Sequence, residues 1–404
     1  MVDVSAAVRA SRGKAVLAGA ALLFALSAGL AGTALAEPYL AVREGYNCGG
    51  CHTNITGGGK RTDIVATHAR QLLHYPDFMS AWATPADTFT GEINKYVGIG
   101  ANVRLGNLAV LQDEADASGR VANNTAFRGR LESNTLDVSE AVAFLDVRLI
   151  PERLSFYLDQ RFAPNTDTRE VFALLRGLPA NGFIKAGRMF LPYGLQLQDD
   201  AAFIRAGKNG SATTNFSFNT RQSGFEAGIE PGPYSAIIAV SDGAAGDRDV
   251  WLTGTVSAMW TELPVVRNLL LGVSAARMGG GSETLAVGCF GGTSLGPLTG
   301  LAEADFLDTR TASSGGHQGT FVAYGELNWL LAGWLNLKAA LDYADDDGDI
   351  SRRADDSENR VSLGLEPFLN RFLQPRLFYR VSNGVRAQPS HNQDQLLAEL
   401  HLFF

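Results

Sequence analysis

Two cysteines and a histidine near the start of the chain stand at a spacing that supports chemistry. The stretch "YNCGGCH" at residues 46–52 places Cys48, Cys51 and His52 in the pattern C-x-x-C-H. This pattern can serve as a redox dithiol, as half of a zinc site, or as the attachment site of a c-type haem. The chain has one further cysteine, Cys289, so its cysteines do not form a disulfide scaffold.

The surrounding sequence favours haem over the other two sites. A zinc site would need more ligands at fixed spacing, and only His68 and His74 lie near. A thioredoxin-like dithiol would need a βαβ pattern around it, which the sequence lacks. Two thiols three positions apart can reach the two vinyl groups on one edge of a porphyrin. We therefore predict that Cys48 and Cys51 attach one covalent haem c and that His52 ligates its iron.

The second axial ligand is less tightly specified. On a helix expected from about residue 63 to residue 73, Ile64, His68 and Leu72 share one face, so an apolar face presents one imidazole. We predict His68 as the sixth ligand, with His74, Met79 and a five-coordinate iron as alternatives. Three cations, Arg43, Lys60 and Arg61, are candidates for pairing with the haem propionates, against the simpler interpretation that they are solvated.

The first 36 residues have the pattern of an export signal. A positive start with Arg9, Arg12 and Lys14 precedes an apolar run that ends in the cleavage pattern Ala-Leu-Ala at 34–36. We predict a signal peptide at 1–36, a monohaem cytochrome c domain at 37–90 and a second domain at 91–404. The chain has 34 basic and 42 acidic residues, a net charge of −8, which argues against a nucleic-acid partner.

The second domain alternates apolar and polar residues with the period of a β-strand. In "RLSFYLDQRF" at 153–162, Leu154, Phe156, Leu158 and Phe162 share one face, and polar residues occupy the other. The chain ends in the same way, on a strand with a terminal phenylalanine, Phe404. Such strands suit a wall that faces lipid on one side and water on the other.

Short turns alternate with longer polar loops along this domain. Short turns are expected at 150–153, 230–233, 262–268, 330–334 and 370–375, and longer loops at 191–221, 242–248, 310–319, 345–357 and 384–394. This asymmetry is typical of outer-membrane barrels. We predict an all-β transmembrane barrel of 16 antiparallel strands counted from Ala126 onward, or 18 if residues 95–114 add a pair. The haem domain would be small, with helical and irregular structure, and would sit in the lumen or at its periplasmic mouth. Inward charges such as Arg376 would hold it there by charge pairing.

A leader, one N-terminal c-type haem and a single barrel together resemble the fused cytochrome–porins, a family that includes outer-membrane iron oxidases. Pro38, the run "AVREGY" at 41–46 and "CGGCH" at 48–52 carry the local resemblance. The stretch "GRMFLPYG" at 187–194 is also similar to a strand-end motif of phosphate-selective porins. The segment from Thr53 to Gly59 lacks the aromatic-proline pattern of the iron-oxidising members, so the resemblance implies haem attachment more strongly than iron as substrate.

The resemblance implies a function in electron transport. The protein would carry electrons across the outer membrane through one haem, with extracellular Fe²⁺ as a candidate donor and a periplasmic c-type cytochrome as the carrier on the other side. An Fe(II) oxidase is the enzyme activity that this implies. The alternative from another class is a solute-conducting porin whose haem domain is regulatory or periplasmic.

Overall fold

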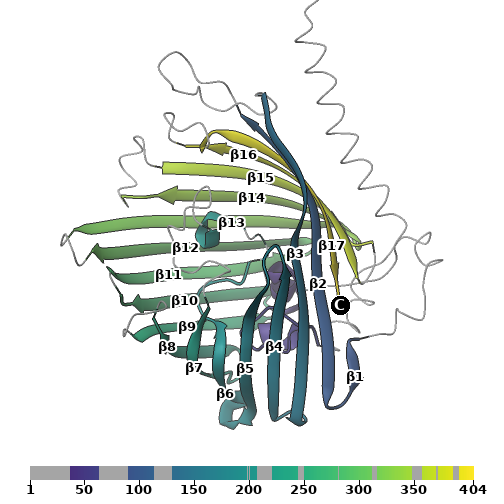
Figure 1. The fold of residues 1–404 in the computed structure, drawn as a ribbon, viewed down its shortest axis with the longest axis vertical. Coiled ribbons are helices and arrows are strands. Elements are labelled where there is room, and N and C mark those ends of the chain that lie inside the picture. Colours follow the sequence, from purple (N-terminus) through teal and green to yellow (C-terminus); the bar gives the residue numbers. More distant parts are fainter. Residues whose placement is uncertain are drawn as a thin grey trace, which may run out of the picture.

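A computed structural model of the chain is dominated by one closed β-barrel (Figure 1). It describes residues 37–62, 90–112, 130–197, 199, 201–206, 221–243, 250–280, 282–311, 316–347, 357–369, 372–384 and 391–404. The predicted signal peptide, most of the segment 63–90, and the ligand candidates His68, His74 and Met79 lie outside these residues. Those predictions therefore stay predictions.

Sixteen antiparallel strands close on one another, because β17 pairs with β2 (for example Leu400 with Leu105) and each other strand pairs with its neighbour in sequence. The strands are β2 Val97–Gln112, β3 Arg130–Ile150, β4 Leu154–Ala163, β5 Asp167–Leu178, β6 Gly182–Phe190, β7 Arg221–Ile229, β8 Tyr234–Asp242, β9 Val250–Thr261, β10 Asn268–Met278, β11 Ser282–Leu295, β12 Leu298–Thr311, β13 His317–Ala332, β14 Leu335–Asp345, β15 Ser357–Pro367, β16 Leu373–Asn383 and β17 Gln393–Phe403. The predicted all-β barrel of sixteen antiparallel strands is confirmed.

The assignment of strands near the N-terminus differs from the prediction. Residues 95–114 do not form a pair of barrel strands: β2 is a single strand, and the three-residue β1 (Glu92–Asn94) only folds back on its first residues. In the described part of the chain, fifteen strands, not sixteen, follow Ala126. Gly98 of β2 leaves room for the side chain of Lys60. A Cβ at Gly98 would lie 2.5 Å from Cε of Lys60, which crosses the inner face of β2.

The wall is apolar outside and polar inside. On β15, the side chains of Val361 and Leu363 are 47% and 57% exposed, whereas the alternating Arg360 and Ser362 are 4% and 2% exposed. Phe156 and Phe162 of β4 likewise point outward, and Tyr157 and Asp159 point inward. This inverts the pattern of soluble proteins, in which the polar face meets solvent. It confirms the period-two reading of 153–162.

Two of the described segments occupy the lumen. One, here called the lumen segment, is residues 37–62, with helix α2 (Pro38–Glu44) and the single turn α3 (Cys48–Cys51). The other, here called the inner loop, is residues 191–206 without 198 and 200, and contains α6 (Phe203–Ala206). The two share an apolar cluster that includes Tyr39, Leu40 and Phe203. A short 3₁₀ turn, η2 (Pro179–Asn181), joins β5 to β6. None of the helices among the described residues is both long enough and apolar enough to cross a membrane.

Candidate functional site

The lumen segment begins with a short helix whose ends follow from its sequence. Pro38 occupies the first turn of α2, where its missing N–H costs nothing. Gly45 ends the helix at φ +73°, and its N–H bonds to the carbonyl of Val42. Asn268 of β10 then fixes this end to the wall, because its Nδ2 donates to the Val42 and Arg43 carbonyls at 2.9 and 2.7 Å. The turn α3 is thereby held at a defined place in the lumen.

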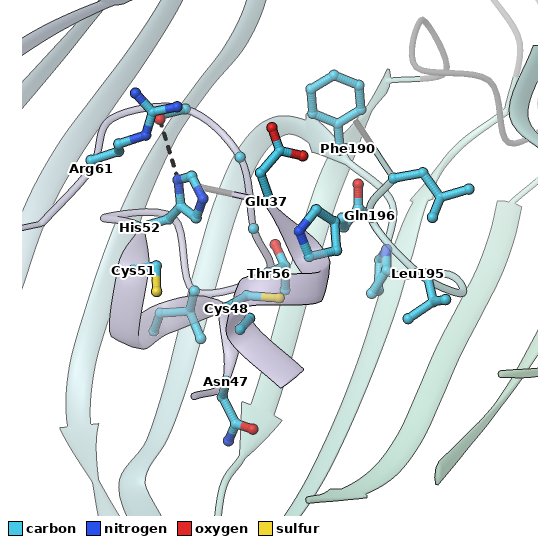
Figure 2. Close-up of a pocket in the computed structure, with 18 of the residues that line it drawn as sticks. Glu37, Asn47, Cys48, Cys51, His52, Thr56, Arg61, Phe190, Leu195 and Gln196 are labelled. Carbon is cyan, nitrogen blue, oxygen red and sulfur yellow. Dashed lines mark hydrogen bonds between the residues drawn. The ribbon is translucent and has the colours of Figure 1, made fainter. Parts of the chain in front are cut away.

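The C-x-x-C-H pattern folds into one helical turn. The N–H of His52 donates to the Cys48 carbonyl at 3.0 Å, and Cys48 and Cys51 fall on one side of the turn because they stand three positions apart. Both cysteines are free thiols. Nδ1 of His52 lies 3.3 Å from the Gly59 carbonyl, to which it can only donate, so Nε2 keeps its lone pair (Figure 2). The structure therefore brings Cys48, Cys51 and His52 together, as the spacing predicts.

A glycine turn places the carbonyl that faces His52. Gly57, Gly58 and Gly59 have φ of +100°, +80° and +69°, where residues with a Cβ are strained. Gly59 also packs against the wall, because a Cβ there would meet Oη of Tyr157 at 1.8 Å. The next residue, Lys60, donates its backbone N–H to the same Tyr157 hydroxyl at 3.0 Å.

We expect Gly59→Ala to displace this turn and to loosen His52. Gly58→Ala is the matched control, since it carries the same backbone strain of roughly 1–2 kcal/mol but has nothing within 4 Å of its Cβ. Unfolding in urea and protease cleavage of the lumen segment should show a larger loss for Gly59→Ala than for Gly58→Ala. Equal losses in the two variants would contradict the contact with Tyr157.

A cavity of about 680 Å³ opens beside the two thiols and the imidazole. The lumen segment, the inner loop and the inward side chains of β2 to β11 line it, with Phe190 and Leu195 among them (Figure 2). Its size lies within the range of about 300–1,000 Å³ that is usual for ligand pockets. We call it the lumen cavity.

The surroundings of the thiols suit ligand attachment better than thiol–disulfide exchange. Although Cys48 is open to the lumen cavity, burial within the barrel raises the pKa of its thiol to about 11. Burial also raises the pKa of Cys51. A redox dithiol needs a depressed pKa at its attacking thiol. Burial, together with the charge of Arg61, lowers the pKa of His52 to about 4, so the imidazole is neutral at pH 7, the form that binds metals.

Wall side chains hold the lumen segment along its length. Glu37 pairs with Nη2 of Arg376 at 3.0 Å, which confirms the predicted charge pairing through Arg376. The next anchors are hydrogen bonds from Asn54 Nδ2 to Glu170 at 3.3 Å and from Lys185 Nζ to Thr56 Oγ1 at 2.6 Å. Arg176 bonds to the Thr53 carbonyl, and Lys60 pairs with Glu92. The lumen segment is thus attached to both sides of the barrel.

The inner loop is a second set of site residues, and the sequence predicts only a long polar loop at these positions. Arg205 pairs with Glu303 at 2.7 Å, and the N–H of Phe203 donates to Asp342 at 2.8 Å. Asp199 bonds to Arg380 at 3.0 Å. The run from Leu191 to Leu197, apolar yet placed in a polar connection, was the one signal that this loop folds inward.

Asp199 makes the attachment of the inner loop dependent on pH. Burial raises its pKa, but Arg380 and Arg360 outweigh burial and bring it to about 2, below the ordinary 3.8. A lowered pKa stabilises the fold above the ordinary value, and this stabilisation is lost as the pH falls through about 2. From neutral pH down to about 4, we expect the wild-type protein to have a higher melting temperature than Asp199→Asn. The difference between the two melting temperatures should disappear in stronger acid. A difference in melting temperature that disappears already near neutral pH would contradict the lowered pKa of Asp199.

Comparisons with known proteins support the architecture. No protein-family model and no curated protein sequence matches the chain. Among solved structures, a loop-deletion mutant of OmpT from Vibrio cholerae has 11% identity and a TM-score of 0.54, covering 76% of this chain and 100% of that one. The outer membrane channel DcaP of Acinetobacter baumannii has 10% identity and a TM-score of 0.54, covering 76% of this chain and 97% of that one. An anion-selective porin from Comamonas acidovorans has 14% identity and a TM-score of 0.54, covering 76% of this chain and 99% of that one. At these identities the likeness is one of fold: a sixteen-stranded barrel of porin architecture.

Proposed function

We propose that this chain is an outer-membrane protein of the porin class, with the lumen segment built into its channel. The observation that carries this proposal is the barrel wall, in which apolar side chains face outward and charged side chains face inward. Lipid on one side and a polar lumen on the other account for that inversion. The similar structures, which include an outer membrane channel and an anion-selective porin, support the same setting.

Conduction of small solutes is the primary function within this proposal. The lumen cavity gives space inside the wall, while the lumen segment and the inner loop narrow the path. Single-channel recording in planar lipid bilayers tests it. Stepwise currents in salt are the expected result, with small steps because of the two inner segments. Bilayers that stay silent although folded protein has inserted would argue against solute conduction.

A second function, electron transfer, is favoured by the geometry at Cys48, Cys51 and His52. Two free thiols lie on one side of a turn, beside an imidazole that keeps its Nε2 lone pair, and all three line the lumen cavity. This donor set fits a c-type haem, whose iron would supply one-electron exchange. Cys48 and Cys51 would hold it by adding each S–H across a vinyl group, so that a C–S bond forms and the proton goes to the neighbouring carbon. His52 would ligate the iron, with Gly59 fixing the tautomer.

The remaining residues would insulate and position this group. The barrel wall separates the lumen cavity from lipid, and the anchors of the lumen segment fix His52 relative to the wall. The second ligand predicted from sequence, His68, is part of the proposal. So are an extracellular donor such as Fe²⁺ and a periplasmic c-type cytochrome as partner.

An absorption spectrum of protein made in cells that mature c-type cytochromes tests the second function. A c-type spectrum that Fe²⁺ reduces within seconds is the result expected if iron is the donor. A c-type spectrum that Fe²⁺ leaves oxidised would keep the haem and remove iron. Protein without covalent haem would leave the solute channel as the sole function.

A further inference from the structure

Among the residues that the structure describes, five arginines line the lumen cavity, and four of them have a carboxylate partner on the wall. Nε of Arg104 lies 3.2 Å from Glu140, and Nη1 of Arg221 lies 3.5 Å from Asp167. The other two are Arg161, which pairs with Asp167, and Arg169, which pairs with Glu140 and Asp159. These four guanidinium groups share three carboxylates, Glu140, Asp159 and Asp167, in a network that runs from β2 to β7 and keeps an excess of positive charge.

The fifth, Arg61, lies on the lumen segment and not on the wall. Its guanidinium carbon lies 3.6 Å from the centre of the Phe403 ring, a cation–π contact that fixes its direction. Its Nε is buried and has no hydrogen-bond partner among the described residues. Within the same described part of the chain, no carboxylate lies within salt-bridge distance of it. Arg61 is therefore a fixed cation beside a cavity, with bonding capacity left over.

The other two cations that the sequence offered for binding an anionic group are engaged elsewhere. Lys60 is buried and pairs with Glu92, across Gly98 of β2. Arg43 pairs with Glu44 at 3.2 Å and does not line the lumen cavity. The structure thus selects Arg61 from the three candidates.

The charges around Arg61 favour an anion in the lumen cavity. Arg104 and Arg376 are near enough for their positive charges to act on it. The carboxylate that acts on it most, Glu37, is bonded to Arg376 at 3.0 Å. A cation held among other cations raises the local concentration of anions. A guanidinium group is also the side chain best shaped to bind a carboxylate through two parallel hydrogen bonds.

We propose that Arg61 binds a carboxylate group of a ligand in the lumen cavity, with Arg104 adding positive charge from the wall. Two sources share this chemistry. One is a propionate of the haem, which rests on the proposed electron-transfer function. The other is a small organic acid that enters the barrel, which rests on the proposed conduction of solutes. Arg61 would be a positioning residue for the first ligand and a selectivity residue for the second.

One experiment tests the haem source in full-chain protein that carries haem. The midpoint potential is titrated for wild type, Arg61→Gln, Arg61→Lys and the matched control Arg43→Gln, which changes a cation of the same segment outside the cavity. Because a nearby cation favours the reduced haem, Arg61→Gln should lower the potential. Arg61→Lys should restore most of it, and Arg43→Gln should leave it unchanged.

A second experiment tests the free acid. Citrate is titrated by calorimetry into full-chain protein with Cys48→Ala and Cys51→Ala, which cannot attach haem. Adding Arg61→Gln should weaken citrate binding about tenfold, the size of one charge-assisted hydrogen bond. If Arg61→Gln does not fold, Phe403→Leu replaces it, because this variant keeps the charge and removes the ring that directs it.

The outcomes of the two experiments distinguish the haem carboxylate, the free acid and the absence of any carboxylate binding by Arg61. A change in potential alone assigns the haem carboxylate, and a change in citrate binding alone assigns a free acid. If wild type carries no haem, the haem function fails and the citrate titration alone decides on Arg61. Arg61 variants that match Arg43→Gln in each available measurement overturn the proposal.

Discussion

Glu226→Leu is expected to be among the most destabilising single substitutions in this barrel. Glu226 of β7 pairs with Lys185 of β6 at 2.8 Å, and neither side chain is exposed. Removing one partner leaves a buried ammonium group with the Thr56 hydroxyl as its remaining hydrogen-bond partner among the described residues. Breaking a buried pair in this way costs about 3–5 kcal/mol. Urea unfolding of the detergent-purified protein, followed by tryptophan fluorescence, measures the loss.

Two further variants show whether the pair itself is responsible. The double variant Lys185→Met with Glu226→Leu removes both charges, and it should recover most of the lost stability because no unpaired charge is left. Glu283→Leu breaks an ion pair of similar length, 2.6 Å, between exposed side chains, and should change nothing measurable. Were the double variant as unstable as Glu226→Leu, lost packing rather than an unpaired charge would be the cause.

The same pair connects the stability of the wall to the lumen segment. Lys185 is bonded both to Glu226 and to Thr56, which stands between His52 and the glycine turn. A lysine that loses Glu226 would shift toward other acceptors. Limited proteolysis of Glu226→Leu in mild urea should therefore cut the lumen segment before the wall unfolds.

The wall could be predicted from sequence because its signal is local and repeated. Phe156 and Phe162 alternate with Tyr157 and Asp159, and short turns alternate with long loops. Each strand repeats one rule, that apolar side chains face outward. The prediction failed only near the N-terminus, where residues 97–112 form one long barrel strand in place of the pair expected at 95–114. Gly98 of β2 makes room for Lys60, a residue distant in sequence.

The site was predictable only in part, for a related reason. The spacing of Cys48, Cys51 and His52 is a short-range pattern, and one helical turn brings them together. The partners of these residues come from far along the chain. Gly59 against Tyr157, Glu37 against Arg376 and Thr56 against Lys185 join the lumen segment to three different strands. The sequence was enough to predict that Arg376 pairs with a charge on the lumen segment. The choice among Arg43, Lys60 and Arg61 as the cation for an anionic group required the structure of the closed barrel.

If the proposed haem is attached at α3, replacing both Cys48 and Cys51 with alanine should abolish covalent haem while the barrel still folds. The two thiols are the only described groups on α3 that can form thioether bonds, and neither bonds to the wall in this structure. In-gel peroxidase staining after denaturation measures covalent haem, and the heat-dependent shift in gel mobility measures the fold. Cys289→Ala is the matched control. This third thiol is exposed on β11, so its loss should leave the staining at the wild-type level.

The pattern of staining across these variants has a definite interpretation. Two thioether bonds attach the group more firmly than one, so Cys48→Ala and Cys51→Ala alone should each keep a reduced signal. The double variant should keep none. Staining that survives in the double variant would show that the haem is attached at a place other than Cys48 and Cys51. Wild-type protein without staining would leave the C-x-x-C-H turn as a structural part of a narrowed channel. In that case Arg61 and its neighbours would act on solutes alone.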